Sequence, residues 1–233
     1  MKFIIETSGS SGPPKSVIVD ESTWAAMAEV DVVDLEIDST SVIAVDRMAT
    51  AILKMFQAKA SGSRLAFYPG HEKASMREWI QEQFITHLST IATTFRWLAS
   101  GIYKFPSVKV VEIGGEMVDW DDVRLCRERF PNAVFINRYA AVEARIICRK
   151  RVERDEPLGT GRMPVGLPVA GVDVWTVPID RLVGEIVVKS SYLSDGYYNN
   201  PELTAAKFKD GCYYTGDKGH WLNNGELMLD GRM

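Results

Sequence analysis

The stretch Thr7-Ser8-Gly9-Ser10-Ser11-Gly12-Pro13-Pro14-Lys15 decides how the rest of the sequence is interpreted. Apolar runs at residues 3–5 and 17–19 flank it and have the composition of short strands. Glycines let the backbone turn its N–H groups toward an anion, hydroxyls add donors, and the lysine adds positive charge. The stretch therefore favours a loop that binds polyphosphate, although a Ser/Gly/Pro linker has the same composition.

A P-loop is a second interpretation of the same residues. Gly9, Pro14, Lys15 and Ser16 fit the pattern G-x-x-x-x-G-K-[ST] except that Pro14 replaces its second glycine. A P-loop binds phosphate through the N–H groups that open a helix, and Pro13 and Pro14 have none. We therefore reject the P-loop and look for partner motifs elsewhere in the chain.

The stretch resembles the phosphate-binding signature of the adenylate-forming superfamily, which includes acyl- and aryl-CoA synthetases, luciferases and adenylation domains of nonribosomal peptide synthetases. That signature reads roughly T-S-G-[ST]-[ST]-G-x-P-K-G-V, and residues 7–17 match it except for Ser16 in place of glycine. Further matches follow in family order: Gly114-Gly115-Glu116, Asn137-Arg138-Tyr139-Ala140-Ala141-Val142-Glu143, Gly184-Glu185-Ile186, Gly196-Tyr197-Tyr198, Thr204-Ala205-Ala206-Lys207-Phe208, Tyr214-Thr215-Gly216-Asp217 and Gly231-Arg232. The resemblance covers nearly the whole chain.

The resemblance implies an ATP-dependent, AMP-forming ligase that activates a small carboxylic acid, either an amino acid or another acid, as an acyl-adenylate. A thioester with CoA, or with the phosphopantetheine thiol of a carrier protein, would follow. Charge spreads over phosphate oxygens in such a reaction, so the site needs donors, cations and Mg²⁺ more than a general base. ATP and Mg²⁺ are the implied cofactors.

The resemblance also assigns a role to each matched residue. The implied phosphate-binding residues are Thr7, Ser8, Gly9, Ser10, Ser11, Gly12 and Lys15; the adenine-binding residues are Gly114, Gly115, Glu116, Asn137 and Tyr139; the ribose-binding residues are Asp217 and Arg232; and the magnesium ligand is Glu143. The chemistry suits these roles, because a carboxylate is a hard ligand for Mg²⁺ and can also accept from two neighbouring hydroxyls. The lysine of the family's lid has no counterpart, so no catalytic residue is assigned.

Each role has a structural alternative when the residues are considered alone. The alternatives are core packing for Tyr139, a salt bridge of Glu143 with Arg145 or Arg149, a simple turn for Gly114 and Gly115, an exposed ion pair of Asp217 with Lys218, and a solvated side chain for Arg232. His71, His87 and His220 share no ligand spacing and receive no role.

Departures from the family pattern leave a second function open. Val142 replaces a threonine and Ala140 a glycine of N-x-Y-G-x-T-E. The resemblance also implies a longer N-terminal part and a C-terminal lid, so the expectation is a truncated core whose enzymatic activity is uncertain. The alternative is a catalytically inactive nucleotide-binding remnant or scaffold, and a third interpretation is an α/β domain whose glycines are only turns.

Composition excludes several classes of partner. The net charge is −4 with both signs interspersed, which argues against nucleic acid and membrane surfaces as partners. No apolar run approaches the ~18 residues of a membrane-spanning helix, and the N-terminus lacks a signal peptide pattern. Cys126, Cys148 and Cys212 are odd in number and widely spaced, so they predict reduced thiols in a cytoplasmic protein.

The hydrophobic pattern predicts an α/β fold. Strands and helices alternate to about residue 147, which favours a largely parallel sheet flanked by helices, and short strands between turns follow. We expect an α/β subdomain at residues 1–157 and a small β-rich, distorted barrel-like subdomain at residues 158–233. Exposed sheet edges would favour self-association.

Predicted helices include residues 22–30, 49–60 (with Ile52, Met55 and Phe56 on one face), 75–84 (capped by Ser75) and 87–98; residues 32–37 are predicted as a strand.

Overall fold

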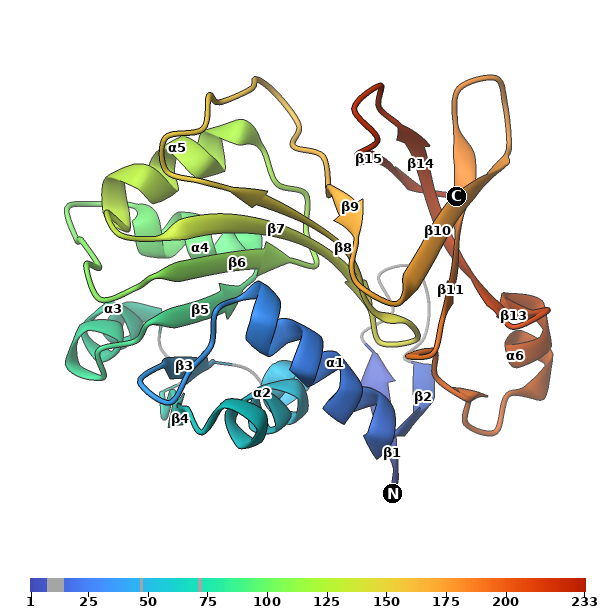
Figure 1. Cartoon of the computed structure of the whole chain (residues 1–233), viewed down its shortest axis with the longest axis horizontal. Helices are drawn as coiled ribbons and strands as arrows, with labels where there is room; N and C mark the ends of the chain where they lie inside the picture. Colours follow the sequence, from blue (N-terminus) through green and yellow to red (C-terminus); the bar gives the residue numbers. More distant parts are fainter. Residues whose placement is uncertain (8–14, 47, 71–72) are drawn as a thin grey trace. The chain divides into compact units, whose positions relative to one another are not determined.

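The computed structural model describes residues 1–7, 15–46, 48–70 and 73–233. It has two compact units, which we describe separately, and Figure 1 labels the elements of both. The first unit comprises residues 1–27, 139–149 and 164–233, and the second comprises residues 28–138 and 150–163. The boundary at residue 157 stays a prediction.

The second unit is built on parallel strands. The strands β3 (Val42–Val45), β4 (Arg64–Phe67), β5 (His87–Thr90), β6 (Val110–Gly114) and β7 (Val134–Ala141) lie in the order β4-β3-β5-β6-β7 with parallel pairing. The helices α2 (Met48–Ser61), α3 (Lys73–Glu82), α4 (Ala92–Ala99) and α5 (Trp120–Arg129) connect successive strands. Strands β8 (Arg145–Val152) and β9 (Leu167–Pro168), most of whose residues belong to the first unit, pair antiparallel with each other. The predicted parallel sheet with flanking helices is confirmed.

The larger hydrophobic core of the second unit lies between the sheet and the helices α3, α4 and α5 (Figure 1). Phe95 of α4 is fully buried, and its ring packs 5.8 Å from that of Phe130 and 5.9 Å from that of Phe135. A smaller cluster contains Ile43 and Val110 from the sheet. Burial of these aromatic rings supplies much of the hydrophobic stabilisation of the unit.

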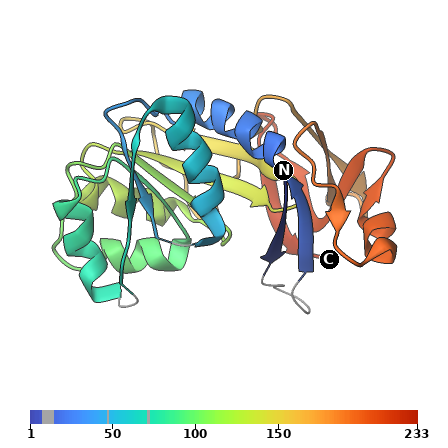
Figure 2. The ribbon, with the colours of Figure 1, turned by 90° about the horizontal axis from the view of Figure 1, so that it is seen from below.

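The first unit is antiparallel. Strands β1 (Lys2–Thr7) and β2 (Lys15–Asp20) form a hairpin, dark blue in Figure 2, and β12 (Gly196–Tyr197) pairs with the other edge of β2. A second sheet contains β10 (Val172–Pro178), β11 (Gly184–Ser190), β14 (Cys212–Trp221), β13 (Phe208–Lys209) and β15 (Leu227–Arg232). Helix α6 (Pro201–Lys207) precedes β13, and α1 (Glu21–Asp34) begins in this unit. The predicted β-rich part is therefore present.

Two sequence-based assignments of secondary structure are wrong. Helix α1 continues to Asp34, so residues 32–37 do not form the predicted strand. The carboxylate of Asp31, which is buried in this helix, accepts a hydrogen bond of 2.6 Å from Gln57 Nε2, so a charged residue is tolerated there. Residues 87–90 form β5 instead of the start of a helix, because they pair with β6 on one side and β3 on the other. In both places, contacts with distant parts of the chain outweigh the preference that the local sequence suggests.

Helices α2 and α3 also differ in detail from their predictions. Residues 48–61 form the predicted helix, in which Met55 is exposed whereas Leu53 and Lys54 are buried. Ser75 lies inside α3 rather than capping it, and its hydroxyl is 2.6 Å from that of Tyr68. No helix among the described residues is long and apolar enough to cross a membrane.

Candidate functional site

The two ends of the Ser/Gly-rich stretch close the β1–β2 hairpin of the first unit. Thr7 pairs with Lys15 across the strands, and the Thr7 hydroxyl donates to the Lys15 carbonyl at 3.3 Å. The Lys15 ammonium lies 5.8 Å from the centre of the Tyr197 ring. Five predicted phosphate-binding residues, Ser8, Gly9, Ser10, Ser11 and Gly12, lie outside the described residues.

Asp217 is held by two partners that are distant in the sequence. Tyr139 Oη donates to Asp217 Oδ2 at 2.7 Å, and Arg232 Nε lies 2.8 Å from Asp217 Oδ1. Asp217 and Arg232 face each other across β14 and β15. The structure thus joins Asp217 to Arg232 and Tyr139, and three predicted nucleotide-binding residues form one cluster.

Burial governs the protonation of this cluster. It raises the pKa of the Asp217 carboxyl above its ordinary value, against the opposing effects of the Tyr139 hydroxyl and the Arg232 guanidinium. Burial, followed by the nearby Asp217 charge, raises the pKa of Tyr139 well above its ordinary value, so its hydroxyl stays a proton donor. The carboxylate is therefore orientated by two fixed donors while its remaining lone pairs can accept further hydrogen bonds.

Glu143 lies in the connection between β7 and β8, and its residue is 7% exposed. Tyr197 Oη donates to Glu143 Oε1 at 2.8 Å, and no described residue makes a hydrogen bond to Oε2. Arg145 interacts with Glu143 electrostatically, but its guanidinium donates to Thr23 Oγ1 at 2.9 Å and lies 4.4 Å from the centre of the Trp24 ring. A buried carboxylate thus presents one oxygen that the described residues leave available.

The surroundings of Glu143 fit Mg²⁺. Mg²⁺ commonly takes one or two carboxylates and completes its shell with water and substrate phosphates, so a full protein cage is not required. Within the described ranges, no group of three or more His, Cys, Asp or Glu side chains could hold a metal ion by itself. Glu143 therefore offers a single carboxylate oxygen to a metal ion at this position.

The remaining predicted adenine-binding residues, Gly114, Gly115, Glu116 and Asn137, belong to the second unit. A Cβ added at Gly114 would lie 2.9 Å from Arg138 Nε and from the Arg138 carbonyl oxygen, so Arg138 occupies that space. Gly115 has φ +80°, a conformation that favours glycine. Asn137 is buried beside Ile113 in the β6–β7 pairing. Their adenine-binding role stays a prediction.

Glu116 caps helix α4. Its Oε2 accepts from the backbone N–H and from the hydroxyl of Thr93, each at 2.7 Å. Glu116→Ala is expected to lower the free energy of unfolding by about 1 kcal/mol, because the first turn of α4 loses an acceptor. Urea unfolding measures this loss. An unchanged midpoint would contradict the capping role, and a parallel loss of ATP affinity would support the predicted adenine contact.

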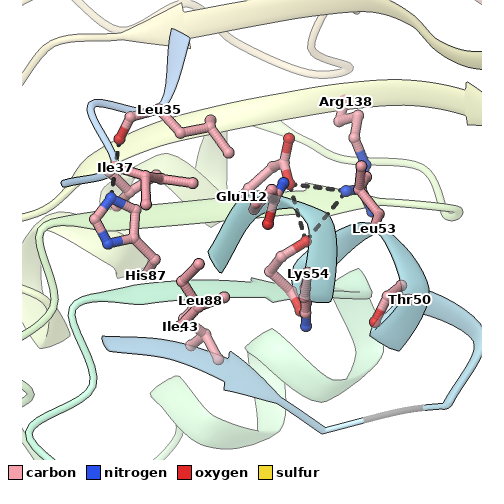
Figure 3. Close-up of a pocket in the computed structure, with 13 residues that line it drawn as sticks. Leu35, Ile37, Ile43, Thr50, Leu53, Lys54, His87, Leu88, Glu112 and Arg138 are labelled. Carbon is pink, nitrogen blue, oxygen red and sulfur yellow. Dashed lines mark hydrogen bonds and ion pairs between the residues drawn. The ribbon is translucent and has the colours of Figure 1, made fainter. Parts of the chain in front are cut away.

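A partly open pocket lies in the second unit, and Figure 3 shows its lining side chains. Apolar residues including Leu35, Ile43 and Val110 line it together with the charged residues Lys54, Glu112 and Arg138. Arg138 Nη1 lies 2.8 Å from Glu112 Oε2, and Ser89 Oγ donates to the same oxygen at 2.9 Å. Sequence reasoning gave no role to these charges. Glu112 is the residue whose position in the sequence could have indicated a buried charge, since it interrupts an otherwise apolar buried strand.

A second buried ion pair joins the helix α2 to the end of β3. Lys54 Nζ lies 3.4 Å from Asp46 Oδ1, and both side chains are buried. Thr90 also donates to Asp46, at 3.2 Å. The Asp46 side chain, which follows β3, is therefore part of the interior of the unit.

The protein is a mixed α/β protein whose antiparallel first unit holds the cluster of Tyr139, Asp217 and Arg232. Comparison with known proteins gives the family: the sequence model described as AMP-binding enzyme matches residues 1–198, so the chain belongs to that family. Tyrocidine synthase 2 of Brevibacillus parabrevis is 28% identical over 261 residues, which cover 100% of this chain and 7% of that protein. The D-alanine–D-alanyl carrier protein ligase of Streptococcus pneumoniae (strain 70585) is 28% identical, with coverages of 99% and 49%.

Solved structures confirm the fold. The nonribosomal peptide synthetase FmoA3 superposes with a TM-score of 0.86 at 22% identity over 98% of this chain and 27% of that one. The O-succinylbenzoate coenzyme A synthetase (MenE) of Bacillus subtilis, in complex with ATP and magnesium ion, gives a TM-score of 0.84 at 20% identity over 98% and 49%. The chain spans from 7% to about half of the length of these curated relatives.

Proposed function

We propose that the chain binds Mg·ATP for an ATP-dependent, AMP-forming carboxylate ligase. The observation that carries this proposal is convergence within the first unit. Lys15, Tyr139, Glu143, Asp217 and Arg232 come from separate segments, and contacts of 2.7–2.8 Å join Tyr139, Asp217 and Arg232 and also join Glu143 to Tyr197. Membership of the AMP-binding enzyme family supports the same conclusion.

The proposed reaction begins when a carboxylate oxygen of the acid attacks the α-phosphorus of ATP. The new O–P bond gives an acyl-adenylate, and the bond to the β-phosphate breaks to release pyrophosphate. A thiol that has lost its proton to solvent then attacks the acyl carbon to form the thioester, and the bond from that carbon to the AMP oxygen breaks to release AMP. Mg²⁺ supplies positive charge that neutralises the phosphate oxygens.

The residues of the first unit have positioning and electrostatic tasks in this proposal. Lys15 and Thr7 contact the phosphates at the ends of the Ser/Gly-rich stretch. Asp217, held by Tyr139 and Arg232, accepts hydrogen bonds from the ribose hydroxyls, while Glu143 Oε2 is the metal ligand. No general base is needed, because the attacking acid is already ionised at neutral pH.

The substrate is proposed as an amino acid or another small carboxylic acid, and the acceptor as CoA or a carrier-protein thiol. The names of the relatives support this, since they include a carrier protein ligase and a peptide synthetase. Self-association through sheet edges and a cytoplasmic location stay predictions.

The second candidate function is nucleotide binding without catalytic activity. Val142 and Ala140, which replace a threonine and a glycine of the family pattern, favour it. Calorimetric titration with Mg·ATP, followed by pyrophosphate exchange with a panel of acids, separates the two. Exchange with any acid supports the ligase, saturable ATP binding without exchange supports the inactive protein, and absence of ATP binding contradicts both.

Glu143→Gln tests the metal role directly. The amide oxygen of glutamine can still accept from Tyr197, so the local hydrogen bond is retained while the charge is removed. We expect Mg²⁺ to strengthen ATP binding to the parent protein and to have about ten- to a hundredfold less effect on the variant. Titrations with ATP in Mg²⁺ and in EDTA measure this, and an equal magnesium effect in both proteins would exclude Glu143 as the ligand.

A further inference from the structure

Tyr197 lies where three parts of the first unit meet. It belongs to β12, where it pairs with Val17 of β2. The backbone N–H groups of Asp195 and Tyr198 donate to carbonyls of β2 at 3.0 and 2.7 Å, so the segment is tied to β2 on both sides of Tyr197. Since β2 begins at Lys15, the backbone of Tyr197 is fixed relative to one end of the Ser/Gly-rich stretch.

The side chain of Tyr197 extends this connection to Glu143. The residue is only 4% exposed, and its hydroxyl donates to Glu143 Oε1 at 2.8 Å. The buried Tyr213 side chain interacts electrostatically with both Tyr197 and Glu143. A terminal carboxylate rotates freely about its last torsion unless a partner fixes it. The hydroxyl therefore sets the direction in which Oε2 points.

The ring of Tyr197 also contacts Lys15. The ammonium lies 5.8 Å from the ring centre, within the range of a cation–π interaction. On its backbone side, Tyr197 N–H donates to the Thr204 hydroxyl at 2.9 Å. A Cβ at Gly196 would lie 2.4 Å from Thr204, so glycine permits this close approach. One side chain thus contacts both a proposed phosphate ligand and a proposed metal ligand.

We propose that Tyr197 is a positioning residue of the Mg·ATP site, orientating the Glu143 carboxylate through its hydroxyl and the Lys15 ammonium through its ring face. This inference rests on the proposed function. It adds a residue that contacts neither the nucleotide nor the metal but determines how strongly magnesium assists binding. Partners in such an outer shell affect metal affinity by about ten- to a hundredfold.

Tyr197→Phe separates this role from simple packing. The variant keeps the ring, and hence the contact with Lys15, and removes only the hydroxyl. Calorimetric titration with ATP is performed in Mg²⁺ and in EDTA for the parent, for Tyr197→Phe and for the control Tyr198→Phe. Tyr198 is adjacent and 50% exposed, so the control makes the same chemical change without touching Glu143.

We expect Tyr197→Phe to raise the dissociation constant for Mg·ATP about tenfold and to leave the constant in EDTA unchanged. The control should match the parent in both conditions. Equal weakening with and without magnesium would show a merely structural role and overturn the inference, as would an unchanged constant in magnesium. If the parent itself does not bind ATP, the proposed function fails instead, and the two failures are distinguishable.

Tyr213→Phe keeps the test decisive if Tyr197→Phe does not fold. Tyr213 is buried and interacts electrostatically with both Tyr197 and Glu143, so removal of its hydroxyl should change the magnesium dependence in the same direction by a smaller factor. Thermal unfolding of each variant is recorded alongside. A folded Tyr213→Phe with the magnesium dependence of the parent would overturn the inference in that case.

Discussion

Asp217→Ala is expected to weaken ATP binding by about a hundredfold or more in calorimetric titration, because the ribose would lose its proposed acceptor. Each hydrogen bond to a charged group contributes roughly 1.5–3 kcal/mol, and the two neighbouring hydroxyls of ribose can both donate to one carboxylate. The cluster supports the expectation, since Tyr139 and Arg232 fix the carboxylate before any ligand arrives. Asp173→Ala, an exposed change on β10 of the same unit, serves as the control and should bind as the parent does.

Asp217→Asn distinguishes loss of binding from loss of fold. Burial raises the pKa of the carboxyl, so the ionised form costs folding free energy at every pH above that raised pKa. The neutral amide avoids this cost and can still accept from Tyr139. The variant should therefore unfold at no lower urea concentration than the parent at pH 7, and any advantage should shrink as the pH falls through the pKa. Parent-like ATP affinity in Asp217→Ala would show that the ribose assignment is wrong.

The pairing of Asp217 with Arg232 shows how far the sequence could predict the site. Asn223-Asn224-Gly225 is a hairpin signal, and β14 and β15 do pair around it. The register, however, shifts by one residue between Lys218 and Gly219. An uninterrupted ladder would place Gly231 opposite Asp217, so the contact with Arg232 depends on a bulge that no composition rule locates.

Tyr197 was missed for a related reason. Its strand has only two residues, Gly196 and Tyr197, and its partner Val17 lies far away in the sequence. Short strands of this kind carry no periodicity, because alternation needs at least four residues to be recognised. The G-Y pattern indicated the family but not the hydrogen bond to Glu143.

Buried charge limited the prediction of the second unit. The apolar spacing of α2 drew attention to Ile52, Met55 and Phe56, yet Lys54 is buried and lies 3.4 Å from Asp46. A pattern of apolar residues cannot reveal an ion pair whose two members neutralise each other inside a domain. By contrast, the run at residues 110–113 lies in the strand β6 and has the composition of one, because Val110, Val111 and Ile113 outweigh the single Glu112.

The pair formed by Glu112 and Arg138 gives the largest expected change in stability. The side chains are 3% and 11% exposed, and Arg138 Nε has no hydrogen-bond partner although it is buried. Glu112→Leu leaves the guanidinium buried without its counter-charge, so the free energy of unfolding should fall by about 3–5 kcal/mol. Glu128→Leu, at a side chain that is 65% exposed, should change it by no more than about 0.5 kcal/mol.

A double-mutant cycle shows whether the loss comes from the uncompensated charge. Arg138→Met alone leaves the Glu112 carboxylate buried without its counter-charge, so this variant should also be destabilised. The double variant Glu112→Leu with Arg138→Met replaces the pair by apolar side chains of similar size, a change that is often neutral or stabilising for a buried ion pair. Urea unfolding at pH 7 should therefore place the double variant close to the parent. Additive losses would instead mean that each side chain acts through separate contacts, since only coupled charges can restore stability when both are removed.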